Sequence, residues 1–347
     1  MTDVIEPSVE TDDEKVKAWA GKIGALPEYK ARLKFQTAAD LLSTEEPALE
    51  WLIENVWVDR SRGFIAGNPG VGKTWLALEM LLAVASGRPC LGKFKVKQMP
   101  VLLMEEEGSE RNLKRRLHAM ARARAMTPAD TANIHFGIRQ GVKIPQNTPE
   151  ITRYCHAEGI GLIIFDSLRR FHGMDENSSS EMQAVLDSFA ALHTLTESSL
   201  ILIHHLGKGS RETDHRPVFE RMRGSSDFWA WRDCIIGLEG QEGANSVTAK
   251  FQFRDADSPL PILINRVTNE NGGIQLEAGE WEDDEDVAYQ IEQITEWMKV
   301  QMGPMSRNQI HEKVGGRKQD VLRTLGLMEK KGLIVAGKEG LRLVQVV

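Results

Sequence analysis

The stretch GFIAGNPGVGKTWLA, residues 63–77, decides which fold we expect for this chain. Its central GNPGVGKT, residues 67–74, fits the pattern G-x-x-x-x-G-K-[ST] without a mismatch. Apolar residues 64–66 predict a short strand before it, and residues 75–85 predict a helix after it. Glycines at these positions let backbone N–H groups turn inward around a polyphosphate, and the helix offers its positive end to the same charge. Strand, loop and helix in this order predict a phosphate-binding loop rather than a chance glycine-rich turn.

The residues of this loop have separate expected roles in holding ATP and Mg²⁺. The Lys73 ammonium is placed to reach the β- and γ-phosphates, and the Thr74 hydroxyl is placed to hold the metal. The residues expected to bind the nucleotide are Gly67, Asn68, Pro69, Gly70, Val71, Gly72, Lys73, Thr74 and Trp75.

Composition places the chain among globular cytoplasmic proteins. Of its 347 residues, 41% are hydrophobic and 27% are charged, and its net charge of −7 does not by itself suggest nucleic acid. Cys90, Cys155 and Cys234 lie too far apart for a zinc motif or a disulfide framework, so reduced thiols are expected. The sequence shows no signal peptide and no apolar run of membrane-spanning length, so we expect no membrane contact.

The pattern along the chain predicts two domains. After an N-terminal arm, residues 1–36, expected to be partly disordered, residues 37–279 alternate short apolar runs with helical patterns. This alternation predicts an α/β domain whose mostly parallel sheet is flanked by helices. The predicted buried strands are 64–66, 101–104, 162–165, 200–203 and 235–238. Residues 247–253 and 262–264 predict an antiparallel hairpin at one end of the sheet.

A second, smaller domain is expected after an acidic linker, residues 280–286. Three helical patterns and a strand–turn–strand pattern then predict a winged helix-turn-helix over residues 287–347, with Ser306 opening a capping box. Val321, Leu322, Leu325 and Met328 are expected to face inward. This part has ten basic and six acidic residues, a net charge of +4, which leaves −11 for the rest. The side chains expected to contact DNA are Arg317, Lys318, Arg323 and Lys338, although such domains also serve as protein adaptors.

Polar residues follow three of the predicted strands. Asp166 ends an apolar strand, which favours Mg²⁺ binding over a simple helix cap. Residues 105–107 are three successive glutamates after another strand, and a carboxylate near the γ-phosphate can orient the attacking water. Periodicity does not choose among these carboxylates, Glu110 included. His204 and His205 end a further strand, and only one of the two can point at the nucleotide because successive strand residues face opposite sides.

Taken together, these motifs resemble the RecA-superfamily ATPases of the RepA type, which include hexameric replicative helicases of plasmids. The resemblance covers residues from about 37 to 270 and rests on TAADLL, residues 37–42, on the loop above, and on VLLMEEEGSERNLKRRL, IIFDSLRRFHGMDENSSSEM, LIHHLGK and RGSS. It implies a RecA-like fold, to which the C-terminal winged helix is appended.

The resemblance also implies roles for individual residues. Glu107 matches the catalytic glutamate, with Glu106 as the alternative; His205 and Lys208 match the family's His-His-x-x-Lys run, and Asp166 matches the metal-site acid. An arginine finger is expected to act across a subunit interface. Arg254, on the late hairpin with Lys250, is the first candidate for the finger, and Arg223 is the second.

The function that this resemblance implies is an ATP-dependent DNA helicase or translocase in the replication of a plasmid, phage or other mobile element. The expected assembly is a homo-oligomer, a hexamer, with single-stranded DNA in its channel and a primase or initiator protein as a further partner. Residues 171–180 and 206–223 are expected to face the channel, the second loop carrying Lys208 and Arg211. Two alternatives remain: an ATP-controlled DNA-binding regulator and a recombinase-like ATPase, neither of which unwinds DNA.

Overall fold

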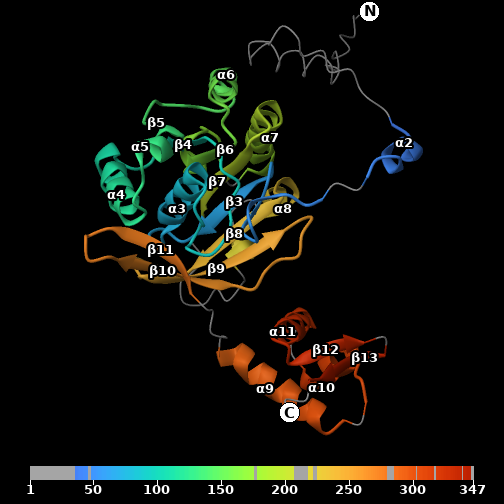
Figure 1. The fold of residues 1–347 in the computed structure, drawn as a ribbon. Helices are drawn as coiled ribbons and strands as arrows, with labels where there is room; N and C mark the ends of the chain where they lie inside the picture. The colour runs from blue at the N-terminus through green and yellow to red at the C-terminus, as the bar shows by residue number, and fades with distance from the viewer. Residues whose placement is uncertain are drawn as a thin grey trace, which may run out of the picture. The chain divides into compact units, whose positions relative to one another are not determined.

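The computed structural model describes residues 36–45, 48–175, 178–206, 218–221, 225–279, 285–301, 303–315, 318–337 and 339–344. The chain divides into two compact units, residues 1–279 and 280–347 (Figure 1). The expected arm therefore lies almost wholly outside the described residues. None of the described helices is both long and apolar enough to span a bilayer.

The larger unit is built on a nine-stranded sheet with the order β11-β10-β9-β8-β3-β7-β6-β4-β5. Six neighbouring strands are parallel, which confirms the expected mostly parallel sheet. They are β3 (Arg62–Gly67), β4 (Val101–Glu105), β5 (Ile134–Ile138), β6 (Leu162–Asp166), β7 (Ser199–His205) and β8 (Cys234–Glu239). Strand β7 lies between β3 and β6, so the phosphate-loop strand and the Asp166 strand are not direct neighbours.

Three antiparallel strands extend this sheet beyond β8. They are β9 (Ser246–Phe253), β10 (Ile262–Thr268) and β11 (Ile274–Gly279). The expected hairpin is therefore present as β9 and β10, while β11 was not predicted. A small separate hairpin, β1 (Trp51–Ile53) with β2 (Trp57–Val58), was not predicted either.

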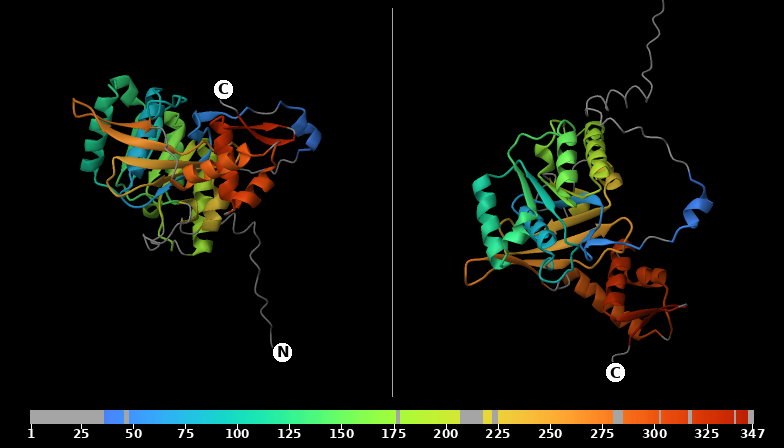
Figure 2. Two further views of the ribbon diagram at one scale, coloured as in Figure 1. Left: turned by 90° about the horizontal axis from the view of Figure 1, so that it is seen from below. Right: turned by 45° about the horizontal axis from the view of Figure 1, so that its top comes forward.

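Helices cover both faces of the sheet, as Figures 1 and 2 show. Helices α3 (Lys73–Ser86) and α4 (Glu110–Ala123) contribute to one apolar core, and α6 (Thr148–Glu158), α7 (Ser179–Thr196) and α8 (Ser225–Trp231) contribute to the other. Ile65 packs in the first core and its neighbour Phe64 in the second. Both faces of β3 are thus buried, which explains why its sequence is apolar without alternation. The remaining short elements are α2 (Ala38–Leu42), α5 (Pro128–Ala132), η1 (Leu168–Arg170) and η2 (Val218–Arg221).

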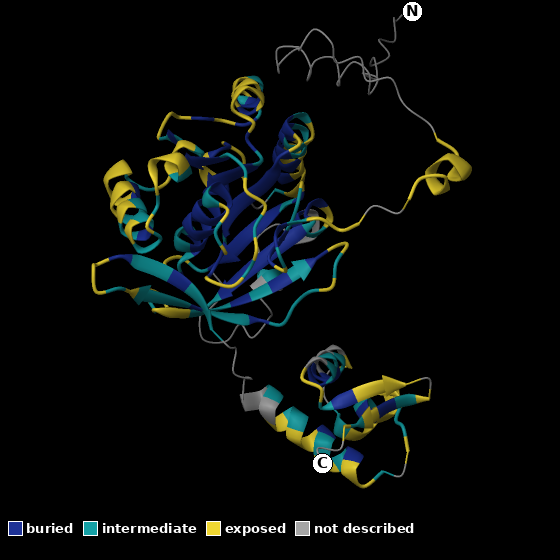
Figure 3. Ribbon diagram, in the orientation of Figure 1, coloured by how far each residue is buried: buried dark blue, intermediate teal, exposed yellow. Residues whose placement is uncertain are grey.

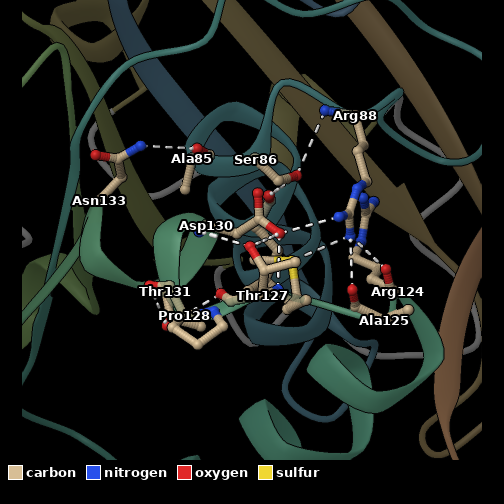
Figure 4. A network of polar contacts seen from close by, with 12 residues as sticks. Ala85, Ser86, Arg88, Arg124, Ala125, Thr127, Pro128, Asp130, Thr131 and Asn133 are labelled. Atoms are coloured by element: carbon tan, nitrogen blue, oxygen red, sulfur yellow. Dashed lines mark hydrogen bonds and ion pairs between the residues drawn. The ribbon is translucent and has the colours of Figure 1, made fainter.

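A polar junction fixes the carboxyl end of α4 against the end of α3 and the start of α5 (Figure 4). The Arg88 guanidinium donates to the backbone carbonyl oxygens of Arg124 and Ala125 and pairs with Asp130 at 2.9 Å. A cation at the last carbonyls of a helix satisfies acceptors that have no partner within the helix. Asp130 also forms the capping box of α5 with Thr127. Its side chain therefore connects the start of α5 to Arg88, which binds the end of α4.

The C-terminal unit consists of α9 (Glu285–Lys299), α10 (Arg307–Val314), α11 (Lys318–Lys330) and an antiparallel hairpin of β12 (Ile334–Gly337) and β13 (Gly340–Leu343). Ser306 caps α10 reciprocally with Gln309, in the predicted capping box. Val321, Leu325 and Met328 are buried in its core as expected. Leu322 was wrongly expected to be inward: it is only half-buried, and Thr324 and Leu327 are buried instead.

Candidate active site

The phosphate-binding loop joins β3, which ends at Gly67, to α3, which begins at Lys73. Gly70 and Gly72 have φ values of +76° and +103°, a region in which L side chains are strained. A Cβ added at Gly67 would lie 2.7 Å from Val71 Cγ1 and 3.0 Å from the Leu238 carbonyl oxygen. The glycines are therefore required for this loop to turn tightly against β8 and lead into the helix.

Lys73 lies buried beneath this loop. Its Nζ donates to the carbonyl oxygens of Gly67 and Asn68, both at 2.9 Å, and lies 3.1 Å from His205 Nδ1. Burial lowers the pKa of Lys73 to about 8, an effect that Asp166 and Glu107 oppose. The ammonium is thus held at the centre of the loop, where phosphate oxygens would replace its carbonyl partners.

Thr74, which follows β3, and Asp166, which ends β6, lie in contact although β7 separates their strands. Thr74 Oγ1 donates to Asp166 Oδ2 at 2.6 Å. Burial, followed by the neighbouring Glu105 carboxylate, raises the pKa of Asp166 to about 7. A hydroxyl and a carboxylate oxygen side by side, next to a phosphate loop, fit the oxygen ligands that Mg²⁺ prefers. Among the described residues no cluster of three or more His, Cys, Asp or Glu could hold a metal ion.

The three successive glutamates point in three directions. Glu105, the last residue of β4, turns inward and accepts from the N–H groups of Glu107 at 2.8 Å and Gly108 at 2.6 Å. Glu106 turns away from the loop and accepts from the N–H groups of Gln140 and Val142. Glu107 accepts a hydrogen bond from the Ser167 hydroxyl and lies 3.3 Å from His205 Nε2. Only Glu105 and Glu107 therefore reach the phosphate site.

The contacts of Glu107 keep it ionised. The hydrogen bond with His205 is the largest cause that lowers the pKa of Glu107 to about 2, against the effect of burial, and Ser167 acts in the same direction. Because Lys73 donates to Nδ1 of His205, the proton of a neutral imidazole lies on Nε2 and points at Glu107. His204 faces the opposite side of β7, buried beside Phe64 and Phe228. His205 and not His204 therefore lines the cavity beside the phosphate loop, as the alternation of side chains along a strand predicts.

One cavity of about 250 Å³ is lined by Lys73, Thr74, Glu105, Glu107, Asp166 and His205. Two of its lining residues, Arg116 of α4 and Arg266 of β10, were not identified from the sequence. Their guanidinium carbons lie 5.4 Å and 5.5 Å from the ring centre of Trp75, and Arg266 also donates to Asn245 Oδ1 at 2.8 Å. Residues from α4 and β10 reach the loop only through the folded sheet, so no local sequence signal points to them.

The first candidate for the arginine finger lies away from this cavity. The backbone N–H of Arg254 donates to the Asp233 carbonyl, and its guanidinium contacts Asp233 Oδ1 at 3.3 Å and the Ala230 carbonyl. Asp233 precedes β8, whereas the phosphate loop follows the other end of the parallel β3. Arg254 therefore cannot serve the cavity of its own chain. Lys250 forms an ion pair with Glu239, and Arg223 lies outside the described residues.

Most of the residues expected to contact DNA also lie outside the described residues: Lys208, Arg211, Arg317 and Lys338, as well as the side chain of Arg323. Lys318 opens α11 and is exposed. A loop around residues 171–180 was expected to face a channel, and its first two side chains do not face solvent. Phe171 and His172 are buried, with the Phe171 ring packed edge-on against Phe165, and exposure begins at Gly173.

Comparison with known proteins gives one family and several similar structures. A family described as an AAA domain matches residues 27–211. A DnaB-like replicative helicase, solved with its interactions with primase, is 17% identical with a TM-score of 0.48, over 62% of this chain and 57% of that one. The RadB recombinase is 17% identical with a TM-score of 0.43, over 65% and 92% of the two chains. A KaiC-like protein from Pyrococcus horikoshii is 13% identical with a TM-score of 0.45, over 66% and 93%. This chain thus spans less than two thirds of the DnaB-like helicase.

Proposed function

Since the chain belongs to the AAA-domain family, which the match over residues 27–211 shows, we propose that it is an ATP-dependent DNA helicase or translocase of the RepA type. The observation that carries the proposal is the convergence of Lys73, Thr74, Asp166, Glu107 and His205 on one cavity at the carboxyl edge of the sheet. We place its action in the cytoplasm, in the replication of a plasmid, phage or other mobile element.

In the proposed reaction, loop N–H groups and Lys73 bind the β- and γ-phosphates, and Thr74 and Asp166 hold Mg²⁺. When bound, the metal neutralises charge that develops on the phosphate oxygens. Glu107 orients the attacking water. With its pKa at about 2, this carboxylate acts mainly as a fixed acceptor that aims the water and not as a strong ground-state base. His205, between Lys73 and Glu107, connects the phosphate contact to the carboxylate and to the chain that follows β7.

We further propose that the chain assembles into a hexamer in which Arg254 of one subunit reaches the phosphates bound by the next. Its location beyond the amino end of β8 leaves only a role in trans. Its side chain is 41% exposed and its guanidinium is held by Asp233, so the charge is presented near the surface in a fixed position. Single-stranded DNA is proposed to occupy the central channel. The three helices and hairpin of the C-terminal unit are proposed to act as a winged helix that contacts duplex DNA.

The decisive experiment is the unwinding of a forked duplex by the full chain with ATP and Mg²⁺, with Lys73→Ala as the inactive control. Wild-type unwinding that the control lacks supports the helicase. ATP hydrolysis and DNA binding without unwinding would favour a regulator or a recombinase-like ATPase. Mixing Arg254→Ala with Lys73→Ala subunits tests the shared site. Recovery of ATPase at mixed interfaces is expected, and failure of every mixture, including those with Arg223→Ala, would contradict it.

A further inference from the structure

The outer face of α4 carries a stripe of basic side chains. Arg111, Arg115, His118 and Arg122 are exposed and follow one another at intervals of four, three and four residues, with Lys114 beside them. This spacing keeps them on one side of the helix over roughly 16 Å. Leu113 and Met120 are buried on the opposite side. Figure 3 shows α4 as one of the most exposed helices of the larger unit.

The positive charge of this stripe is largely without neutralising partners. Helix α4 has five Lys or Arg residues and one acidic residue, Glu110, which pairs with Lys114 at 2.6 Å. Within the described part of the chain, the side chains of Arg111 and Arg115 have no ion pair and no hydrogen bond. Several other basic residues of the same unit have acidic partners: Arg62, Arg88, Lys97, Arg124 and Arg254. Residues 1–286 are acidic overall, yet on α4 two exposed arginines without an ion pair among the described residues, Arg111 and Arg115, lie one turn apart on the same side of one helix.

The helix is held rigidly beneath these side chains. Ser109 caps its first turn, Arg88 binds the carbonyl oxygens of Arg124 and Ala125 at its end, and Arg122 Nη1 donates to the Asn271 carbonyl at 3.1 Å. A fixed backbone lowers the entropy lost when a ligand binds across several side chains.

We propose that the outer face of α4 binds the phosphate backbone of single-stranded DNA, as a contact separate from the channel loops and from the C-terminal unit. The inference rests on the proposed DNA-acting function. The chemistry of the stripe favours nucleic acid over a protein partner, because protein interfaces need apolar or aromatic anchors at their centre. The large hydrophobic side chains that are exposed in the described residues all lie outside α4. Phosphate contacts need only evenly spaced cations.

The position of α4 links this surface to the ATP site. The helix begins three residues after Glu107, and Arg116 on its inner edge lines the nucleotide cavity. One rigid helix therefore carries DNA-facing cations on one side and a nucleotide-facing cation on the other. A phosphate backbone seated on Arg111 and Arg115 would act on the element that positions Arg116, which gives DNA a route to stimulate hydrolysis.

The test compares two double variants of the full chain: Arg111→Gln with Arg115→Gln, and the control Arg60→Gln with Arg153→Gln. All four arginines are exposed, and the control pair removes the same charge away from α4. Binding of a fluorescent oligothymidylate is measured by anisotropy over a salt series with a non-hydrolysable ATP analogue. For the α4 variant, we expect the log–log salt slope to fall by about 1.4 and the affinity to fall roughly 10- to 30-fold near 0.1 M salt. Basal ATPase and thermal melting should match the control, while half-maximal stimulation should need more DNA.

Each outcome decides the matter. A loss specific to the α4 variant supports the surface. Equal DNA binding by the two variants, whether both are weakened or both unchanged, overturns the proposal. Unchanged DNA binding by the α4 variant together with altered sedimentation also overturns it, and would assign the outer face of α4 to protein contacts. If the wild-type chain binds no DNA at all, the proposed function itself fails. If the wild-type chain binds and the α4 variant binds equally well, only the inference about α4 fails.

Discussion

The carboxyl edge of the sheet and the outer face of α4 use charge in opposite ways. At the edge, Lys73, Asp166 and Glu107 are buried or paired, and their pKa values are displaced to about 8, 7 and 2. On α4, the side chains of Arg111 and Arg115 are exposed to solvent. Fixed partners and exclusion of water make a charge specific for one geometry, as catalysis requires. Free charges keep a long-range, salt-sensitive attraction that suits a polymer of phosphates. The two regions should therefore respond to substitution on very different scales.

The largest effect is expected where the pairing is tightest. Glu107→Gln keeps the size and the acceptor oxygen of the side chain but removes the charge that aligns the water. We expect kcat for ATP hydrolysis to fall by about 10²- to 10⁴-fold, with ATP affinity within about twofold of wild type. Steady-state hydrolysis and equilibrium binding of a fluorescent ATP analogue measure the two quantities.

Glu106→Gln is the matched control because it makes the same chemical change one residue earlier. Its carboxylate binds the N–H groups of Gln140 and Val142, so it should cost on the order of 1 kcal/mol of stability and leave kcat near wild type. The reverse result, a silent Glu107 and an inactive Glu106, would move the catalytic role to Glu106.

An intermediate effect is expected from the C-terminal unit, in which Lys318 is exposed like the arginines of α4, whereas Arg307 and Arg342 pair with Glu329 and Glu339. A chain ending at Gly279 should lose duplex affinity by roughly 10- to 100-fold while basal ATPase stays within about twofold. In the full chain, Lys318→Gln should lower the log–log salt slope by about 0.9. Unchanged duplex affinity after truncation would make the unit a protein docking site, for a primase or an initiator.

The sequence predicted those parts of the fold whose signals are local. The phosphate loop, the five predicted buried strands and the cap of α10 each depend on neighbouring residues, and all of them are present in the structure. Strand β5 was missed because most of its residues are only half-buried, so it lacks the continuous apolar run of a central strand. Strand β11 was missed because most of its residues are only half-buried, and the β1–β2 hairpin was missed because its strands are short.

Parts of the candidate site could not be predicted because they depend on long-range packing. Glu105 and Glu107 are separated by one residue and both reach the cavity. The turn that Glu105 closes with the N–H groups of Glu107 and Gly108 directs the Glu106 side chain away from it. Arg116 and Arg266 reach Trp75 from a helix and a strand that lie far from the loop in sequence. Phe171 has the polar neighbours of a surface loop, yet its ring fills the core against Phe165.

The smallest expected effect concerns His172, which is buried next to Phe171 and shares features of both regions. It has a backbone partner, the Met174 N–H, but its Nε2 is buried without a hydrogen-bond partner in the described structure. Burial, with Arg169 and Lys143 nearby, lowers the pKa of His172 to about 4. The unfolded chain binds a proton below about 6.5 while the folded chain does not, so stability is lost as pH falls from 6.5 towards 4. At pH 5 the loss should be about 1–2 kcal/mol relative to pH 8. His172→Asn, which keeps an acceptor for the Met174 N–H, should flatten this pH dependence in chemical unfolding, and the exposed His118→Asn should not. Equal slopes for both variants would mean that the acid sensitivity of the larger unit arises elsewhere.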